Sequence, residues 1–238
     1  MNQTIGILGG MGPEATVHMF NLIVKYTKAD TDQEHIPIIV FNNPKIPDRT
    51  TAILHGGPSP LQALVESAKL LEKAGADLIV MPCHTAHYFY NEIITHIHIP
   101  FLHLQRETLR CMEQQPGNIK RFGLIATAGT IKMGLFQAVF NESKKGLEII
   151  TPGSEDREIM MAAMYGEKGI KRGFKEEPRE LLLKVIAHLK EQGVEAIIAG
   201  CSETSLVLRE SEMQLPVIDP LKITAKAAIL KAGYKVKE

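Results

Sequence analysis

A repeat of landmark residues about 118 positions apart is the strongest constraint on how this chain folds. Three pairs are separated by 118 residues: Pro60 and Pro178, Gly75 and Gly193, and Cys83 and Cys201. Two further pairs lie 117 and 116 residues apart: Gly6 and Gly123, and Pro100 and Pro216. One matched pair arises easily by chance, but five pairs at nearly one offset do not. The chain is therefore predicted to contain an internal duplication.

The first copy of the repeat begins with a short apolar segment, residues 4–10, which ends in glycines and is typical of a buried parallel strand. Farther along, apolar residues at helical spacing begin after Ser59 and stop at Gly75. The segment 77–82 is a predicted strand, and Cys83 follows it directly. The first copy is therefore predicted to alternate strands and helices and to place Cys83 at the end of a strand.

The second copy follows the same order. Apolar residues at helical spacing run from Pro178 to Gly193, the predicted strand 196–199 follows, and Cys201 comes soon after it. Alternating strands and helices favour open, mostly parallel sheets with helices on both faces. The predicted fold class is therefore α/β, with two lobes of like topology related by a pseudo-twofold axis.

The repeat also predicts the domain organisation. Residues 1–103 with 215–238 are expected to form lobe 1, which carries Cys83, and residues 104–214 to form lobe 2, which carries Cys201. Right-handed crossovers place the loops after parallel strands on one edge of a sheet, where α/β proteins bind ligands. We therefore expect both cysteines at such edges and the active site in the cleft between the lobes.

Charge and hydropathy favour a small-molecule partner. Lys and Arg together number 27, and so do Asp and Glu, so no net field would draw the chain onto nucleic acid or an anionic membrane. The apolar runs are far shorter than the about 20 residues that a transmembrane helix needs. The first four residues do not resemble a signal sequence, and three scattered cysteines are typical of free thiols in a reducing compartment. We expect a cytoplasmic protein with no nucleic-acid partner and no membrane partner.

Two cysteines in equivalent positions suit one particular chemistry. Inversion of a stereocentre by proton exchange requires a base on one face of a carbon and an acid on the other. A free thiol has a pKa of about 8.5, and a helix N-terminus or a positive charge lowers it, so a thiolate and a thiol can coexist in such a pair. The alternative is that Cys83 and Cys201 are small buried apolar residues. Their matched positions favour the catalytic interpretation, whereas Cys111 has no counterpart and is interpreted as structural.

Five motifs make the chain resemble the aspartate/glutamate racemase family over nearly its full length. They are GGMGPEAT (9–16), PDRT (47–50), MPCHTAH (81–87), ATAGTI (126–131) and GCSET (200–204). The resemblance implies that Cys83 and Cys201 exchange protons with the α-carbon of an amino acid, without pyridoxal phosphate or any other cofactor. It also implies a homodimer and an amino-acid substrate, with aspartate first and glutamate or a broader range as alternatives.

Further site residues follow from the same resemblance. The family's donors to the substrate carboxylate and amino groups correspond to the backbone of Met11 and Gly12 and to Thr85, Thr127 and Thr130. Arg49 resembles the arginine that pairs with the side-chain carboxylate of aspartate, a task that suits a bidentate guanidinium. A solvated loop arginine is its alternative. Lys171 resembles a basic residue of the family's lid, with a plain surface lysine as the alternative, and His87 and Glu203 are expected to support the site.

Two positions of the predicted substrate site depart from the family's usual motifs. His84 stands where many members have asparagine, and Ser202 stands where many have threonine. Serine keeps the hydroxyl group, but histidine is larger than asparagine and can carry a charge. One hypothesis is that a protonated His84 holds Cys83 as a thiolate.

Three other functions are open to a chain with these residues. Cys83, His84, His87 and Cys201 are residue types that bind zinc, although no paired C-x-x-C or H-x-x-x-H signature is present, and we expect no metal. Relatives of similar architecture racemise hydantoins, isomerise maleate or decarboxylate arylmalonates, and fold alone separates these reactions poorly. The third alternative is an amino-acid-binding protein without turnover, whose site His84 obstructs.

Overall fold

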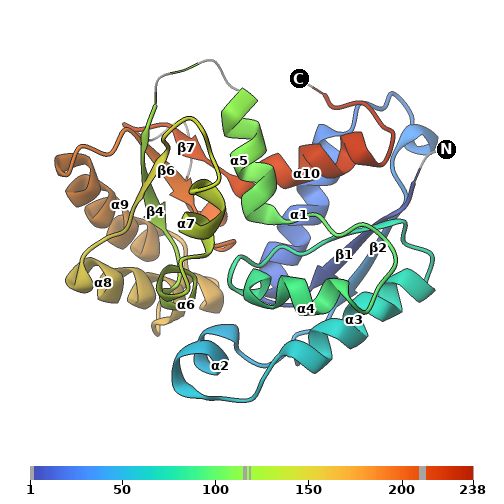
Figure 1. The fold of residues 1–238 in the computed structure, drawn as a ribbon, viewed down its shortest axis with the longest axis horizontal. Coiled ribbons are helices and arrows are strands. Elements are labelled where there is room, and N and C mark those ends of the chain that lie inside the picture. Colours follow the sequence, from blue (N-terminus) through green and yellow to red (C-terminus); the bar gives the residue numbers. More distant parts are fainter. Residues whose placement is uncertain (1–2, 115–116, 118, 209–212, 238) are drawn as a thin grey trace. The chain divides into compact units, whose positions relative to one another are not determined.

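The computed structural model of the protein describes residues 3–114, 117, 119–208 and 213–237. The chain divides into two compact units (Figure 1). Unit 1 comprises Met1–Glu107 and Leu221–Glu238, and unit 2 comprises Thr108–Pro220. Each unit holds its own sheet and its own core, so each is described by itself.

The sheet of unit 1 has three parallel strands in the order β2-β1-β3. The strands are β1 (Ile5–Gly9), β2 (Ile38–Asn42) and β3 (Leu78–Val80). The sheet of unit 2 has four parallel strands in the order β5-β4-β6-β7. These are β4 (Arg121–Ile125), β5 (Glu148–Ile150), β6 (Ala196–Ala199) and β7 (Val217–Ile218). The predicted α/β class with mostly parallel sheets is confirmed.

The two sheets repeat one topology, as the matched landmarks predicted. In each, the first strand is central, the second pairs on one side of it and the third pairs on the other. Unit 1 also has a counterpart of the fourth strand, β7. An isolated parallel bridge joins Ile79 of β3 to Phe101, as the strand β7 pairs with β6 in unit 2.

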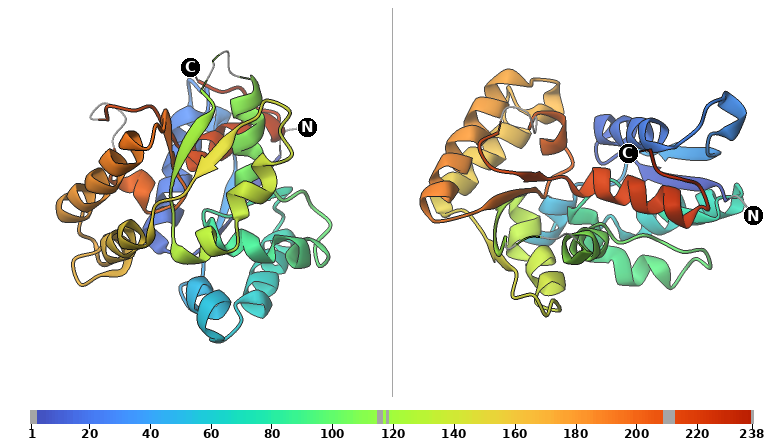
Figure 2. Two further views of the ribbon diagram at one scale, coloured as in Figure 1. Left: turned by 60° about the vertical axis from the view of Figure 1, so that its left-hand side comes forward. Right: turned by 90° about the horizontal axis from the view of Figure 1, so that it is seen from above.

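Helices cover both faces of each sheet, as further views of the ribbon show (Figure 2). Those of unit 1 are α1 (Pro13–Tyr26), α2 (Arg49–His55), α3 (Leu61–Lys73), α4 (Tyr90–Ile94) and α10 (Pro220–Lys231), with 3-10 turns η1 (Asp32–Glu34) and η2 (Thr85–Phe89). The others are α5 (Leu104–Gln114), α6 (Ala128–Lys132), α7 (Leu135–Phe140), α8 (Ser154–Tyr165) and α9 (Glu176–Glu191), with 3-10 turns η3 (Ile170–Arg172) and η4 (Thr204–Leu206).

The core of unit 1 lies on both sides of its sheet. Ile5 and Ile7 of β1 pack with α1 and α10 on one face, while Leu8 packs with α3 on the other. Unit 2 is built in the same way, with α8 and α9 on one face and α5 and α7 on the other. Strands covered on both faces are apolar throughout, which explains the short apolar runs of the sequence.

The predicted helix ends hold at both copies of the repeat, and α3 begins where predicted, but α9 begins two residues before Pro178, at Glu176. Ser59 Oγ accepts a hydrogen bond from the backbone N–H of Leu61 at 3.3 Å, where α3 begins. Gly75 and Gly193 have φ angles of +97° and +78°, so each ends its helix in the left-handed conformation that glycine adopts without strain.

The boundaries between the units lie a few residues later than those predicted for the lobes. The sequence placed residues 215–238 in lobe 1, but Val217 pairs with Ile197 of β6, so β7 is part of unit 2. The chain enters unit 1 again only at Leu221. In the part of the chain that the structure describes, no helix has the length and apolar character needed to cross a membrane.

Candidate functional site

Most predicted site residues of unit 1 follow its adjacent strands β1 and β3, and Arg49 comes after β2. Ile7 of β1 pairs with Val80 of β3, so the loop at Met11 and the loop at Cys83 leave the same edge of the sheet. Both side chains are buried, and both belong to one core cluster with residues of β3 and α3. This half of the site is therefore formed by strand ends that the parallel sheet brings to one edge.

The glycine-rich loop before α1 is held by Thr16, a residue that the sequence analysis did not single out. The Thr16 hydroxyl accepts a hydrogen bond from Gly10 N at 2.9 Å and donates one to the Gly12 carbonyl at 3.1 Å. Gly10 has a φ of +101°, and a Cβ there would lie 2.3 Å from the Asn43 carbonyl carbon. Only glycine fits this position, and the spacing of Thr16 from Gly12, one helical turn, is the signal that could have identified the brace.

Arg49 is buried at the start of α2, so the alternative of a solvated loop arginine is wrong. Its Nη2 donates to the Met11 carbonyl at 3.3 Å, and its Nη1 donates to the Pro47 carbonyl at 3.1 Å and the Ile46 carbonyl at 3.4 Å. These bonds fix the guanidinium against the glycine-rich loop. The structure therefore brings together two of the predicted substrate-binding residues, Met11 and Arg49.

The loop at Cys83 is held by His87. The imidazole Nδ1 of His87 lies 2.8 Å from the Cys83 carbonyl oxygen, and its Nε2 accepts the backbone N–H of Leu104 at 3.2 Å. These partners assign the neutral tautomer with the proton on Nδ1. Burial lowers the pKa of His87 to about 4, although backbone hydrogen bonds near Cys83 and Leu102 raise it in part. His87 is thus a neutral brace for the backbone that carries the thiol.

His84 and Thr85 are both buried beside Cys83. Burial lowers the pKa of His84 to about 3, and repulsion by a positive charge on the neighbouring His87 contributes to a lesser extent. The hypothesis of a protonated His84 that holds Cys83 as thiolate is therefore wrong, because the imidazole is neutral near pH 7. Cys83 is followed by the short 3-10 turn η2, not by an α-helix, so a helix dipole contributes little there.

His103 completes a cluster of rings with His87 and Tyr90. Its ring lies 4.9 Å from that of His87 and 4.6 Å from that of Tyr90. Burial lowers the pKa of His103 to about 2, and repulsion by positive charges on His87 and Arg106 adds to this effect. The spacing of His87 and His103 in the sequence does not predict this contact. It forms because the segment at Phe101 pairs with Ile79 of β3 and so brings His103 back to His87.

Most predicted residues of unit 2 also follow adjacent strands, β4 and β6, while Lys171 lies in η3 between two helices. Ile125 of β4 pairs with Ala199 of β6, so Thr127 and Cys201 leave one edge of the sheet. Thr127 begins α6, where its hydroxyl accepts the Thr130 N–H at 3.3 Å and donates to the Thr130 hydroxyl at 3.1 Å. Both threonines and the neighbouring Ser202 are buried.

Cys201 belongs to a polar triad with Glu203 and Lys171, in which the thiol and the carboxylate are buried and the lysine is half-buried. The thiol donates to Glu203 Oε2 at 3.0 Å, and the Lys171 ammonium donates to the other oxygen, Oε1. Lys171 also lies over the ring of Tyr165, 5.2 Å from its centroid. The interpretation of Lys171 as a plain surface lysine is therefore wrong, and Tyr165 is a member of the site region that sequence reasoning missed.

The charges of the triad set its protonation state. Burial, and then the Glu203 carboxylate, raises the pKa of the Cys201 thiol well above its usual range, while Lys171 opposes this in part. Burial disfavours ionisation of Glu203, but the charge and hydrogen bond of Lys171 outweigh it and lower the pKa of that carboxyl. Burial likewise disfavours the Lys171 ammonium, yet Glu203 raises the pKa of Lys171 above its ordinary value. Near pH 7 the triad is a neutral thiol beside an ion pair, not the thiolate that the sequence analysis allowed at either cysteine.

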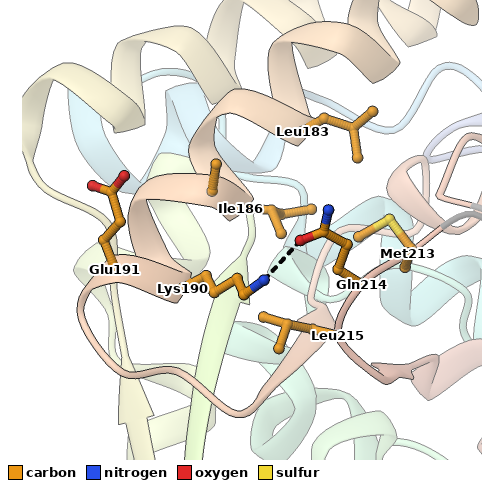
Figure 3. A pocket seen from close by; sticks show the side chains of 8 residues that line it. Leu183, Ile186, Lys190, Glu191, Met213, Gln214 and Leu215 are labelled. Carbon is orange, nitrogen blue, oxygen red and sulfur yellow. Dashed lines mark hydrogen bonds between the residues drawn. The ribbon is translucent and has the colours of Figure 1, made fainter.

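A surface cavity of about 620 Å³ lies elsewhere in unit 2, between α9 and the segment 213–215 (Figure 3). Lys190 Nζ donates to Gln214 Oε1 at 2.7 Å inside it. Its lining includes Leu183, Ile186, Met213 and Leu215. None of the predicted site residues lines this cavity. Among the described residues, no group of three or more His, Cys, Asp or Glu side chains is arranged to hold a metal ion.

Comparisons with known proteins agree with this architecture. The pattern of the Asp/Glu/Hydantoin racemase family matches residues 8–228. The "Broad specificity amino-acid racemase RacX" of Bacillus subtilis (strain 168) is 28% identical over 233 residues, which cover 94% of this chain and 96% of that protein.

Solved structures match the whole chain. The Picrophilus torridus aspartate racemase has a TM-score of 0.88 and 29% sequence identity, with 99% of this chain and 96% of that chain covered. A putative Asp/Glu racemase from Yersinia pestis has a TM-score of 0.78 and 30% identity, with 97% and 99% covered. The chain therefore belongs to the Asp/Glu/hydantoin racemase family, and its enzyme class is that of an isomerase.

Proposed function

We propose that this protein racemises an amino acid by proton exchange at the α-carbon, with Cys83 and Cys201 as the two acid/base groups. The observation that carries the proposal is the equivalence of the two thiols. Each is a free, buried cysteine that follows the third strand of its repeat, 118 residues from the other. An enzyme that inverts a stereocentre needs one such group for each face of the carbon.

The protonation state of the Cys201 triad gives the proposed reaction a direction. Since Cys201 is a thiol at rest, it is the proton donor, and a Cys83 thiolate removes the α-proton. The C–H bond breaks as the Cys83 S–H bond forms, and the Cys201 S–H bond breaks as a new C–H bond forms on the opposite face. The reverse reaction begins with the protons exchanged. As the family resemblance implies, the proposed reaction uses no pyridoxal phosphate.

We propose aspartate as the first substrate to test. The resemblance assigns Arg49 to the side-chain carboxylate, and the structure holds this buried cation against the loop at Met11. A planar guanidinium suits a carboxylate. The similarity to the aspartate racemase of Picrophilus torridus supports aspartate, whereas the similarity to the broad-specificity amino-acid racemase of Bacillus subtilis supports a broader range. Backbone N–H groups of Met11 and Gly12 and the hydroxyls of Thr85, Thr127, Thr130 and Ser202 are the proposed donors to the remaining polar groups.

The proposed enzyme is a homodimer, as the family resemblance implies, and it acts in the cytoplasm, where its three free thiols stay reduced. The alternative is an amino-acid-binding protein without turnover, and one measurable property distinguishes it from an enzyme. A binder leaves the α-proton in place, and an enzyme exchanges it with solvent.

The deciding experiment incubates L- and D-aspartate, glutamate and a panel of neutral amino acids in deuterated water and follows α-deuteration and optical rotation. The wild-type protein is expected to introduce deuterium and to invert at least aspartate. Cys83→Ser and Cys201→Ser should each abolish racemisation, and Cys111→Ser is the matched control that should keep it. Full racemisation by either single variant would refute the two-thiol mechanism, and binding without deuteration would favour the binding protein.

A further inference from the structure

Three lysines of unit 1 surround the ring of one tyrosine. Tyr26 is the last residue of α1, and the ammonium groups of Lys25, Lys222 and Lys226 lie 5.5, 5.9 and 4.7 Å from the centroid of its ring. These lysines come from α1 and α10, two helices that share the core of unit 1 (Figure 1). A ring attracts ammonium groups through its negative faces. The packing of the two helices thus brings three like charges together around Tyr26.

The C-terminal segment of the chain pairs with the end of α1 and adds further lysines. Thr27 forms an antiparallel bridge with Val236, and the backbone N–H of Lys237 donates to the Tyr26 carbonyl at 2.7 Å. Thr27 is buried and Val236 packs against the core, so the residues on either side of them face outward. The exposed lysines at these outward positions are Lys28, Lys235 and Lys237.

Carboxylates do not neutralise this positive charge. The six lysines, called the lysine cluster below, are Lys25, Lys28, Lys222, Lys226, Lys235 and Lys237. In the part of the chain that the structure describes, no ion pair joins any of them except Lys222 to a carboxylate. Glu34, in the loop after α1, instead accepts the backbone N–H of Asp30 at 2.7 Å. Because acidic and basic residues are equal in number over the whole chain, the lysine cluster is a local excess of one sign.

The stability of the helices does not explain the position of Lys222. This lysine lies in the first turn of α10, and that turn holds no acidic residue. The N-terminus of a helix is partially positive, so it favours a carboxylate and disfavours a lysine. Lys25, in the last turn of α1, is by contrast stabilised by its helix. Lys222 and the start of α10 therefore add to a positive potential that attracts anions.

We propose that the lysine cluster binds a chain of phosphate groups, such as inorganic triphosphate or the triphosphate of a nucleotide. A lysine ammonium has three N–H donors and binds phosphate oxygens as a compact point charge. A cluster around one ring suits a ligand that carries several negative charges close together. A nucleic acid spreads its phosphates along a strand and is attracted by an extended field, which a chain of balanced charge does not provide.

The lysine cluster lies apart from the predicted catalytic loops of unit 1. Helix α1 begins directly after the loop at Met11, and Tyr26 lies at its other end. A helix of 14 residues is about 21 Å long. A phosphate chain bound to the lysine cluster therefore does not occupy the loop at Met11, and the inference does not rest on the proposed racemisation.

The first experiment measures the binding of inorganic triphosphate to the full chain by isothermal titration calorimetry, without divalent cations. We expect triphosphate to bind about tenfold more tightly than orthophosphate, and added salt to weaken the binding. The double variant Lys226→Gln with Lys235→Gln should raise the dissociation constant about tenfold or more. The matched control, Lys69→Gln with Lys73→Gln, removes the same charge from exposed positions of α3, on the opposite face of the sheet, and should leave it unchanged. Absence of binding at low salt, or equal weakening by both double variants, overturns the proposal.

A second experiment locates the bound anion on the wild-type protein and does not depend on any variant. Triphosphate should slow the hydrogen exchange of backbone amides, measured by mass spectrometry, in peptides that cover residues 25–28 and 235–237. Protection confined to other segments overturns the proposal.

The same titration separates the possible sources of the phosphate chain. Equal dissociation constants for ATP and inorganic triphosphate would identify the phosphate chain alone as the ligand, and tighter binding of ATP would add a contact to the nucleoside; both results support the proposal. A single-stranded oligonucleotide that binds more tightly than triphosphate would overturn it in favour of a nucleic-acid site. The α-deuteration assay, run separately, reports on the proposed reaction alone.

Discussion

The Cys201 thiol donates a hydrogen bond to Glu203 Oε2 at 3.0 Å, and this contact has no counterpart at Cys83. The residue of the first repeat that corresponds to Glu203, 118 positions earlier, is Thr85, which has no carboxylate. The backbone of each cysteine is nevertheless fixed in a similar way, since Thr204 donates to the Cys201 carbonyl at 2.6 Å and His87 binds the Cys83 carbonyl. The duplication thus kept two matched thiols and placed a carboxylate beside Cys201 at the position where the first repeat has a threonine.

The first prediction concerns the charge of Glu203. Replacing it by glutamine removes the negative charge that, after burial, raises the pKa of Cys201. The thiol pKa should fall, so alkylation of Cys201 by iodoacetamide at pH 8, followed by mass spectrometry, should become severalfold faster. Racemisation should nevertheless fall about 100-fold, because a poorly held proton donor loses much of its acid catalysis.

Glu195→Gln is the matched control for this change. Glu195 is an exposed carboxylate of the same unit, bound to the backbone N–H groups of Lys120 and Arg121. Its replacement should leave Cys201 alkylation as it is. If Glu203→Gln slows the alkylation instead, the charge of Glu203 does not set the thiol pKa.

The second prediction concerns Lys171, whose replacement should raise the pKa of Cys201, whereas replacement of Glu203 should lower it. Lys171 lowers the pKa of Cys201 in part, against the Glu203 carboxylate, which raises it. In Lys171→Met the Cys201 thiol pKa should rise further and its alkylation at pH 8 should slow. Lys168→Met is the control, because its ammonium pairs with the exposed Glu177 at 3.0 Å, away from the triad. Equal alkylation rates in Lys171→Met and the wild type would show that the ion pair has no influence on the thiol.

The repeat, the fold class and the edge position of the predicted site residues within each unit could be read from the sequence. Strand and helix patterns are local, and the glycines at 75 and 193 end their helices as their spacing predicted. The protonation states could not be read in this way. They depend on burial and on contacts between distant residues, such as Lys171 with Glu203 and His103 with His87. A histidine beside a cysteine suggests a charged pair in a sequence, but the fold buries His84 so deeply that it is neutral.

The third prediction follows from that neutrality. Because the pKa of His84 is about 3, both histidine and its replacement in His84→Asn are uncharged between pH 6 and 9. The pH dependence of Cys83 alkylation should therefore be the same in the variant and the wild type. A Cys83 thiol pKa that rises in His84→Asn would show that a protonated imidazole stabilises the thiolate after all.

The fourth prediction concerns acid stability. Burial lowers the pKa values of His84, His87 and His103 from 6.5 to about 3, 4 and 2. Between pH 6.5 and about 4 the unfolded chain binds protons at these histidines and the native chain does not, so stability is lost as the pH falls through this window. At pH 5 the loss is about 2 kcal/mol for each histidine, as an upper value.

His103→Phe tests this linkage while keeping an aromatic ring beside His87 and Tyr90. Urea unfolding at pH 7.5 and pH 5 should show a smaller loss of unfolding free energy in the variant, by up to about 2 kcal/mol, because one proton-binding site of the unfolded chain is gone. His96→Gln, at an exposed position, is the control and should retain the wild-type loss. If His103→Phe loses as much stability between the two pH values as the wild type does, His103 is not held neutral by the fold, and the acid sensitivity of unit 1 has another source.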